Sequence, residues 1–247
     1  EKPFGMIVTS GPTGSGKTTT LYALLHLLKK DGMNISTLED PIEYALAGVN
    51  QIQTNAHADL TFASGLRALL RQDPDVIMVG EIRDSDTVIM AANAAMTGHL
   101  VFTTMHTNDA PSAFTRFLEM KVEDFVVASV INLVIAQRLV RTICNSCRET
   151  YTLDEVTAKK IKDRKDVMRI LEEEHGIKEN ALVRTEFSTG TGCEACLQTG
   201  YIGRIGIYEV LEMNKEIHTL ILNHAPAEKI RETAQKAGFK DMLSDGI

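Results

Sequence analysis

The chain has 247 residues, 44% hydrophobic residues and a formal net charge of -7. This charge argues against a broad, sequence-independent grip on nucleic acid, which needs clustered Lys and Arg. No apolar run reaches the roughly 18 residues of a membrane span and no signal-peptide pattern is present. We therefore expect a cytoplasmic protein with one large domain and a smaller appendage. Because it opens at Glu1 without Met, we also expect it to be part of a longer chain.

Residues 6–20 read MIVTSGPTGSGKTTT, an apolar run, a glycine-rich turn and the start of an amphipathic helix expected over 18–30. This order suits a nucleotide phosphate chain, because the glycines let backbone N–H groups curl around phosphates and the helix N-terminus adds positive charge. We expect Lys17 to reach the β- and γ-phosphates and the Thr18 hydroxyl to ligate Mg²⁺. The residues of this loop predicted to bind a nucleoside triphosphate are Gly11, Pro12, Thr13, Gly14, Ser15, Gly16, Lys17, Thr18 and Thr19.

Three carboxylates follow the next predicted strand, residues 35–38. These are Glu39, Asp40 and Glu43 in LEDPIEY. Ligands of open α/β sheets bind beside the carboxyl ends of the strands, so these acids are placed to meet Mg²⁺ or the attacking water. A solvated acidic turn broken by Pro41 fits the composition equally well.

The next stretch predicts an edge strand or hairpin over 48–57, a helix over 61–72 and a strand over 75–81. The last of these, DVIMVGE, is apolar and rich in β-branched residues, as in a parallel strand buried on both faces. We expect its terminal Glu81 to lie next to the P-loop strand, the apolar run that precedes the glycine-rich turn. There Glu81 is expected to hold Mg²⁺ through water, which is the Walker B role.

A helix over 84–96 and a buried strand over 99–104 continue the alternation. His106 follows that strand on the edge where the ligand is expected, and can hydrogen-bond to the γ-phosphate. The apolar stretch 122–138 predicts a long core or subunit-packing helix, too short for a bilayer. Strands alternating with helices over 6–118 predict an α/β fold with a mostly parallel sheet and right-handed crossovers, of RecA type.

Cys144, Cys147, Cys193 and Cys196 form two CxxC pairs separated by 45 residues, with no cysteine left over. In a cytoplasmic chain this number and spacing of cysteines favour a metal site over disulfides. Two such pairs complete a closed tetrahedral sulfur site, which suits structural Zn²⁺. A rubredoxin-type iron centre uses the same ligands, but nothing in the sequence suggests electron transfer.

The insert 151–184 is highly charged with apolar residues near helical spacing, which predicts a surface helical hairpin. Residues 204–212 alternate like a strand, and two short amphipathic helices follow from Lys215. We expect a RecA-like ATPase core, a zinc-binding insertion and a segment with the returning strand and C-terminal helices, over residues 1–140, 141–203 and 204–247.

The chain resembles the secretion ATPase superfamily, specifically the type II secretion and type IV pilus assembly ATPases. The resemblance spans essentially the whole chain, through GPTGSGKTTT, LEDPIEY, LRQDPDVIMVGEIRD, TGHLVFTTMHTNDAPSAFTR, AQRLVR and the CxxC pairs. It implies a homohexameric motor that hydrolyses ATP to ADP and phosphate and drives pseudopilus or pilus assembly. It also implies a cytoplasmic location, peripheral at the inner membrane without insertion, with platform and docking proteins as partners. Retraction ATPases of the superfamily lack the zinc module, which favours the assembly or secretion branch.

By this resemblance Lys17 is the Walker A lysine, Glu43 positions the lytic water and Glu81 fills the Walker B position. Glu39 is expected near Glu43, and His106 belongs to a histidine box. The candidates for neutralising transferred charge are Arg67, Arg71 and Arg83. Two other functions fit a RecA core: a nucleic-acid translocase or helicase-type motor, and a scaffold that binds ATP only as a switch. Acidic composition opposes the first, and the carboxylate pair opposes the second.

Overall fold

The computed structural model describes residues 2–247. The chain forms two compact units. Unit 1 comprises Glu1–Arg138 and Tyr208–Lys240, and unit 2 comprises Leu139–Ile207 and Asp241–Ile247. The three segments expected from the sequence stay a prediction about domain organisation.

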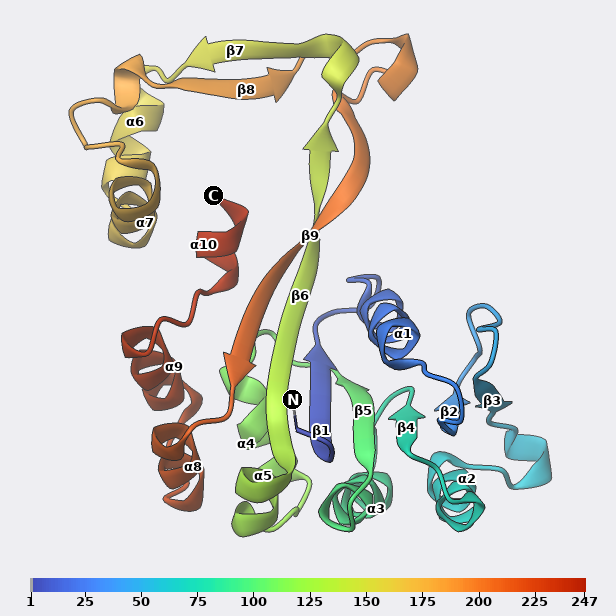
Figure 1. Cartoon of the computed structure of the whole chain (residues 1–247). Coiled ribbons are helices and arrows are strands. Elements are labelled where there is room, and N and C mark those ends of the chain that lie inside the picture. The colour runs from blue at the N-terminus through green and yellow to red at the C-terminus, as the bar shows by residue number, and fades with distance from the viewer. Residues whose placement is uncertain (1) are drawn as a thin grey trace. The chain divides into compact units, whose positions relative to one another are not determined.

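The main sheet has seven strands in the order β3-β2-β4-β5-β1-β6-β9 (Figure 1). Their bounds are β1 (Gly5–Ser10), β2 (Ile35–Glu39), β3 (Asn50–Gln53), β4 (Val76–Val79), β5 (Leu100–Met105), β6 (Ile131–Ile143) and β9 (Tyr201–Glu212). The pairs β1–β5, β1–β6, β2–β3, β2–β4 and β4–β5 are all parallel. The predicted α/β class with a parallel-dominated sheet is confirmed.

The helices of unit 1 connect these strands or follow them. They are α1 (Lys17–Leu28), η1 (Ala56–Ala58), α2 (Phe62–Leu69), η2 (Leu70–Gln72), α3 (Ser85–Met96), α4 (Pro111–Glu119), α5 (Asp124–Val130), α8 (Lys215–Leu222) and α9 (Ala227–Lys236). Side-chain caps fix several of the starts, including those of α2 and α3: Thr61 accepts the N–H of Ser64, and Asp84 accepts that of Thr87. Each such cap stabilises a helix by roughly 1 kcal/mol.

An apolar core holds α1 against the sheet. Leu21, Tyr22 and Leu25 on α1 are at most 1% exposed and pack with Ile35 and Phe102 of the strands. Burial of one such leucine contributes about 1.5–3 kcal/mol. The start of α1, and therefore the loop before it, is fixed by this packing.

The sequence prediction was wrong about the helix over 122–138. In the structure α5 ends at Val130 and β6 begins at Ile131, pairing in parallel with β1, with Val8 opposite Val134. An apolar run rich in Val and Ile suits either element, and here strand pairing beside β1 decides. The expectation that the Glu81 strand lies next to the P-loop strand was also wrong, because β5 separates β4 from β1.

Unit 2 holds the helical pair expected for the charged insert and also a two-stranded antiparallel sheet that the sequence analysis did not predict. Its elements are η3 (Asn145–Cys147), β7 (Arg148–Thr152), α6 (Glu155–Lys162), α7 (Lys165–His175), η4 (Leu182–Arg184), β8 (Glu186–Gly190), η5 (Glu194–Cys196) and α10 (Met242–Gly246). Leu153, Ala158, Met168, Leu171 and Leu182 form a small core. Within residues 2–247, no helix has the length and apolar character needed to traverse a bilayer.

Candidate functional site

The glycine-rich loop joins β1 to α1 and has a backbone that only glycine adopts easily. Gly16, the N-cap of α1, has φ 89°. Gly11 has φ 144°, and a Cβ there would lie 2.4 Å from the carbonyl oxygen of Gln137. The Lys17 side chain folds back over this loop, and its Nζ donates to the carbonyls of Gly11 at 2.9 Å and Pro12 at 3.1 Å.

Lys17 is held by neutral acceptors inside a largely buried setting. It is 9% exposed, and burial lowers the pKa of its amine, while the negative charge of Glu81 raises that pKa and so opposes the effect. Loss of solvent around a cation makes a polyanion a strong partner. The geometry and charge of this loop therefore fit a nucleotide phosphate chain.

Glu81 follows β4 and lies among cationic groups. Its Oε1 is 2.6 Å from Nη2 of Arg83, and its Oε2 is 4.0 Å from Nε2 of His106. Burial and then the charge of Lys17 lower the pKa of His106, and Glu81 opposes them. These effects favour the neutral imidazole of His106. The structure brings Lys17, Glu81 and His106 within electrostatic range of one another.

The end of β5 fixes the backbone around Glu81. Thr104 donates its hydroxyl to the Gly80 carbonyl at 2.7 Å and accepts the N–H of Ile82 at its own carbonyl at 3.2 Å. Thr104 is 3% exposed, so these bonds are shielded from water. Two neighbouring parallel strands thus hold Glu81 and His106 at one edge of the sheet.

The two carboxylates after β2 have different surroundings. Glu39 is 2% exposed and accepts bonds from Thr37 at 2.5 Å and Gln51 at 3.1 Å, and from the Tyr22 hydroxyl. Burial and the Glu39 carboxylate raise the pKa of Tyr22. Glu43 lies exposed in the loop that follows. The structure therefore encloses Glu39 in a side-chain network and leaves Glu43 facing solvent.

The other predicted residues lie in the glycine-rich loop, at the start of α1, on α2 and η2, and between β4 and α3. Thr18 is half-buried at the start of α1. The exposed predicted residues of this segment are Pro12, Thr13, Gly14 and Thr19. Of the three candidate arginines, Arg83 contacts Glu81, whereas Arg71 donates to the carbonyl of Arg67 at 3.0 Å and Arg67 lies 3.9 Å from the sulfur of Met90.

Sequence reasoning missed Gln137 on β6. It is 1% exposed, and its Nε2 donates to the carbonyl of Ser15 in the glycine-rich loop at 2.7 Å. Its Oε1 and the Ser15 hydroxyl are buried without a hydrogen-bond partner among the described residues. A polar residue inside an otherwise apolar run was the available signal, since buried amides need partners.

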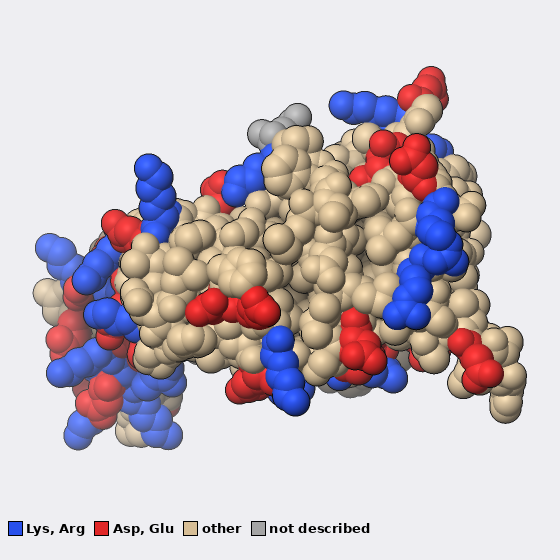
Figure 2. All heavy atoms as spheres, turned by 90° about the horizontal axis from the view of Figure 1, so that it is seen from below, with Lys and Arg blue, Asp and Glu red and all other residues tan. Residues whose placement is uncertain are grey.

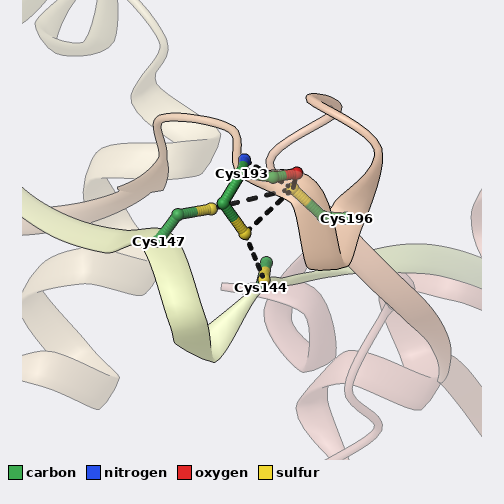
Figure 3. Close-up of side chains that lie close together, drawn as sticks. All are labelled: Cys144, Cys147, Cys193 and Cys196. Carbon is green, nitrogen blue, oxygen red and sulfur yellow. Dashed lines mark hydrogen bonds between the residues drawn. The ribbon is translucent and has the colours of Figure 1, made fainter.

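The four cysteines gather within unit 2 (Figure 3). Their sulfurs all lie within 4.8 Å of one another, with Cys144–Cys193 at 3.9 Å, Cys147–Cys196 at 3.8 Å and Cys193–Cys196 at 3.7 Å. A tetrahedron with Zn–S bonds of about 2.3 Å has edges of about 3.8 Å. The cluster therefore fits a tetrahedral thiolate metal site.

Backbone donors favour the thiolate form of one ligand. The N–H groups of Cys193 and Gly200 donate to Sγ of Cys196 at 3.1 and 3.2 Å. Burial raises the pKa of the Cys196 thiol, but these two backbone bonds and the hydrogen bonds with the Cys193 and Cys147 side chains together outweigh burial, and the pKa falls to about 6. A thiolate is the form that binds a metal.

Charged side chains of both signs are interspersed on the face drawn in Figure 2, and much of that face is uncharged. At one end of this face Lys, Arg, Asp and Glu gather densely together.

The parallel sheet and the glycine-rich loop before α1 define a P-loop nucleotide-binding core of RecA type. The family model described as "Type II/IV secretion system protein" matches residues 1–247. The chain belongs to this family.

Named relatives include both secretion and pilus proteins. The chain is 46% identical over 245 residues to "Type II secretion system protein HxcR" of Pseudomonas aeruginosa, covering 99% of this chain and 45% of that protein. It is 43% identical over 246 residues to "Type IV pilus assembly ATPase PilB" of Thermus thermophilus, covering 100% of this chain and 26% of that protein. The chain thus spans less than half the length of these two relatives.

Solved structures give the same picture of the fold. The pilus retraction motor PilT, solved with bound ADP, matches with a TM-score of 0.66 and 28% identity over 98% of this chain and 56% of that chain. The ATPase DotB of Legionella pneumophila matches with a TM-score of 0.60 at 24% identity over 96% of this chain and 52% of that chain. Both likenesses support the RecA-like assignment.

Proposed function

We propose that the chain is the motor segment of a secretion or pilus-assembly ATPase, converting ATP and water to ADP and phosphate. The observation that carries this proposal is the gathering of Lys17, Glu81 and His106 beside the glycine-rich loop. The relative named a type IV pilus assembly ATPase and the retraction motor solved with ADP support it.

We assign separate roles to the residues of this edge. The loop N–H groups and Lys17 hold the phosphates, and Thr18 is the Mg²⁺ ligand. When bound, Mg²⁺ supplies neutralising charge to phosphate oxygens. Glu81 orients the Mg²⁺ shell, with Arg83 restraining its carboxylate at 2.6 Å. Glu43 positions the attacking water, and its exposed loop supports access to that water.

The partners and location follow from the family resemblance. We propose a homohexamer, cytoplasmic and peripheral at the inner membrane, that acts on a pseudopilus or pilus through a platform protein and cytoplasmic docking proteins. We further propose that Cys144, Cys147, Cys193 and Cys196 hold Zn²⁺. A site closed by four thiolates leaves no position for a substrate, so this metal has a structural role.

Phosphate release by the full-length protein tests the proposed activity. Lys17→Gln should lower kcat/KM by about 10²- to 10³-fold, because it removes charge stabilisation that strengthens in the transition state. Glu81→Gln should retain ATP binding and lose turnover by about 10²-fold. Lys30→Gln, at an exposed lysine following the same helix α1, is the matched control and should behave as wild type. Near-normal turnover in Lys17→Gln would refute the proposal.

A further inference from the structure

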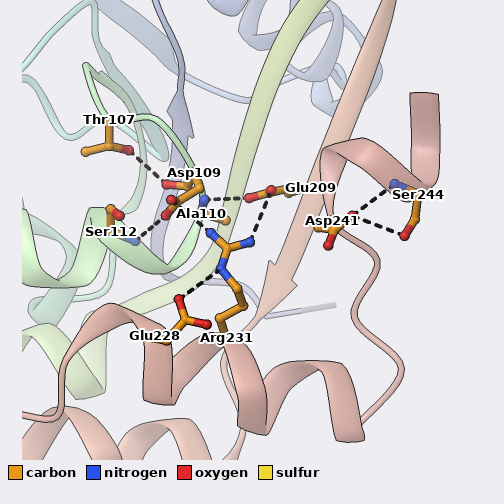
Figure 4. A network of polar contacts seen from close by, with 9 residues as sticks. All are labelled: Thr107, Asp109, Ala110, Ser112, Glu209, Glu228, Arg231, Asp241 and Ser244. Carbon is orange, nitrogen blue, oxygen red and sulfur yellow. Dashed lines mark hydrogen bonds and ion pairs between the residues drawn. The ribbon is translucent and has the colours of Figure 1, made fainter. Parts of the chain in front are cut away.

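Arg231 on α9 is the centre of a polar network within unit 1 (Figure 4). Its Nη2 lies 2.8 Å from Oδ2 of Asp109, and its Nη1 lies 3.7 Å from Oε1 of Glu209. The side chains of Arg231, Asp109 and Glu209 are 21%, 24% and 4% exposed. A third acid, Glu228, lies 3.9 Å from Nε but is 75% exposed, so its contribution is small.

The two inner carboxylates also bind the start of α4. Oε2 of Glu209 accepts the N–H of Ala110, the N-cap of α4, at 2.8 Å, and Oδ1 of Asp109 accepts the N–H of Ser112 at 2.8 Å. An anion at a helix N-terminus is stabilised by the helix dipole and by unpaired N–H groups. Arg231, Asp109 and Glu209, with these two amides, form what we call the Arg231 network.

This network lies at the far end of the short loop that carries His106. β5 ends at Met105, and Asp109 follows His106 by three residues. Three peptide units span at most about 11 Å, so a shift at Asp109 reaches His106 through very little chain. Thr107, inside the loop, donates its hydroxyl to the Asp109 carbonyl at 3.0 Å and ties the loop to the same point.

The other end of the loop is fixed by the sheet. Met105 is 2% exposed and pairs with Ser10 in the β1–β5 ladder. The loop is thus anchored on one side by β5 and on the other by side chains from β9 and α9. His106, 52% exposed on its side chain, lies between these anchors and faces Glu81.

We propose that Arg231 is a positioning residue for the proposed ATPase reaction. By binding Asp109 and Glu209, it sets where the loop places His106 opposite Glu81. This inference rests on the proposed function. It makes helix α9 a determinant of turnover.

Kinetics of the full-length protein test the proposal. Arg231→Gln should lower kcat about tenfold and leave KM for ATP nearly unchanged. A tenfold loss is within the range of coupling energies measured between residues of one polar network. Arg231→Lys retains one charged donor and should recover part of kcat. Lys229→Gln, which breaks only an exposed ion pair to Glu232 on the same helix, is the matched control and should keep wild-type kcat. Wild-type kcat in Arg231→Gln would overturn the inference.

A double variant separates positioning from general loss of stability. If Arg231 acts through His106, the double variant Arg231→Gln/His106→Ala should have a kcat less than about twofold below that of His106→Ala alone. The reason is that the His106→Ala loop has no imidazole left for Arg231 to position. An unchanged tenfold loss in that background would overturn the proposal.

Amide hydrogen exchange tests the Arg231 network by a measurement that does not depend on ATP hydrolysis. In Arg231→Gln, the amides of Ala110 and Ser112 should exchange about tenfold faster, while those of the glycine-rich loop keep wild-type rates. Unchanged rates at both amides would overturn the inference. If the wild-type protein released no phosphate, the proposed function would fail, and this exchange measurement alone would decide whether Arg231 fixes the loop.

Discussion

The glycine-rich edge of unit 1 and the cysteine cluster of unit 2 are built in opposite ways. At the first, Lys17, Glu81 and His106 are far apart in sequence and meet because parallel strands end on the same side of the sheet. At the second, two CxxC turns each supply a ready-made pair of sulfurs. A site placed by topology needs a fold that is stable without its ligand, whereas a site made of short turns is stabilised by the ligand.

The packing around the two sites agrees with this contrast. Leu21, Tyr22 and Leu25 anchor the first site in an extended apolar core. The core of unit 2 is small, and two of its members, Leu153 and Met168, retain 8% and 9% exposure. Ligand removal should therefore affect structure in unit 2 and activity in unit 1.

Removal of the proposed metal should give the largest difference between the two sites. Structural Zn²⁺ contributes apparent free energies on the order of 10 kcal/mol in isolated peptides. Chelation should raise proteolysis and hydrogen exchange around Cys144–Cys196, with ATP-analogue affinity nearly unchanged. Restored protection on adding Zn²⁺ back is the control. Elemental analysis that found no metal in freshly purified protein would contradict the assignment.

Gln137→Leu should have an intermediate effect, confined to the glycine-rich edge. The change removes the donor to the Ser15 carbonyl and also a buried acceptor that lacks a partner, so the melting temperature should change little. Misplacement of the loop should weaken ATP-analogue binding about tenfold, near 1.4 kcal/mol. Titration by calorimetry measures this, with exposed Gln72→Leu as control. Unchanged affinity would mean that the loop holds its shape without Gln137.

The smallest expected effect is a pH dependence at His106. Burial and the charge of Lys17 lower the pKa of His106, so the unfolded state binds this proton more tightly than the folded state. The resulting stability is present above about pH 6.5 and is lost as pH falls through the lowered folded pKa. Thermal unfolding between about pH 5 and 7.5 should show a shallower acid decline for His106→Gln than for wild type or exposed His57→Gln. Parallel curves for all three would contradict this.

Much of unit 1 was predictable because its signals are local. The glycine turn and the caps at Thr61 and Asp84 are fixed by residues within three or four positions. The cysteine spacing likewise specified a cluster, since each pair is its own chelate. The catalytic roles given to Glu43 and Glu81 stay predictions.

The failures involve partners distant in sequence. The stretch 122–138 has no local feature that separates helix from strand, and its β-branched residues became β6 only because β1 was there to pair with. The sequence analysis assigned no role to Arg231 or Glu209, because only the fold brings them to Asp109. The expectation that the Glu81 strand lies next to the P-loop strand failed for the same reason, because no local feature of the sequence specifies that β5 pairs between β4 and β1.

The Glu209 cap has a consequence for biogenesis. The carboxylate that completes the start of α4 comes 99 residues after Ala110. At elongation rates of about 5–20 residues per second, the ribosome makes α4 roughly 5–20 s before its cap exists. Nascent chains in that interval carry an unfinished helix terminus, so a chaperone that shields this segment should matter most then.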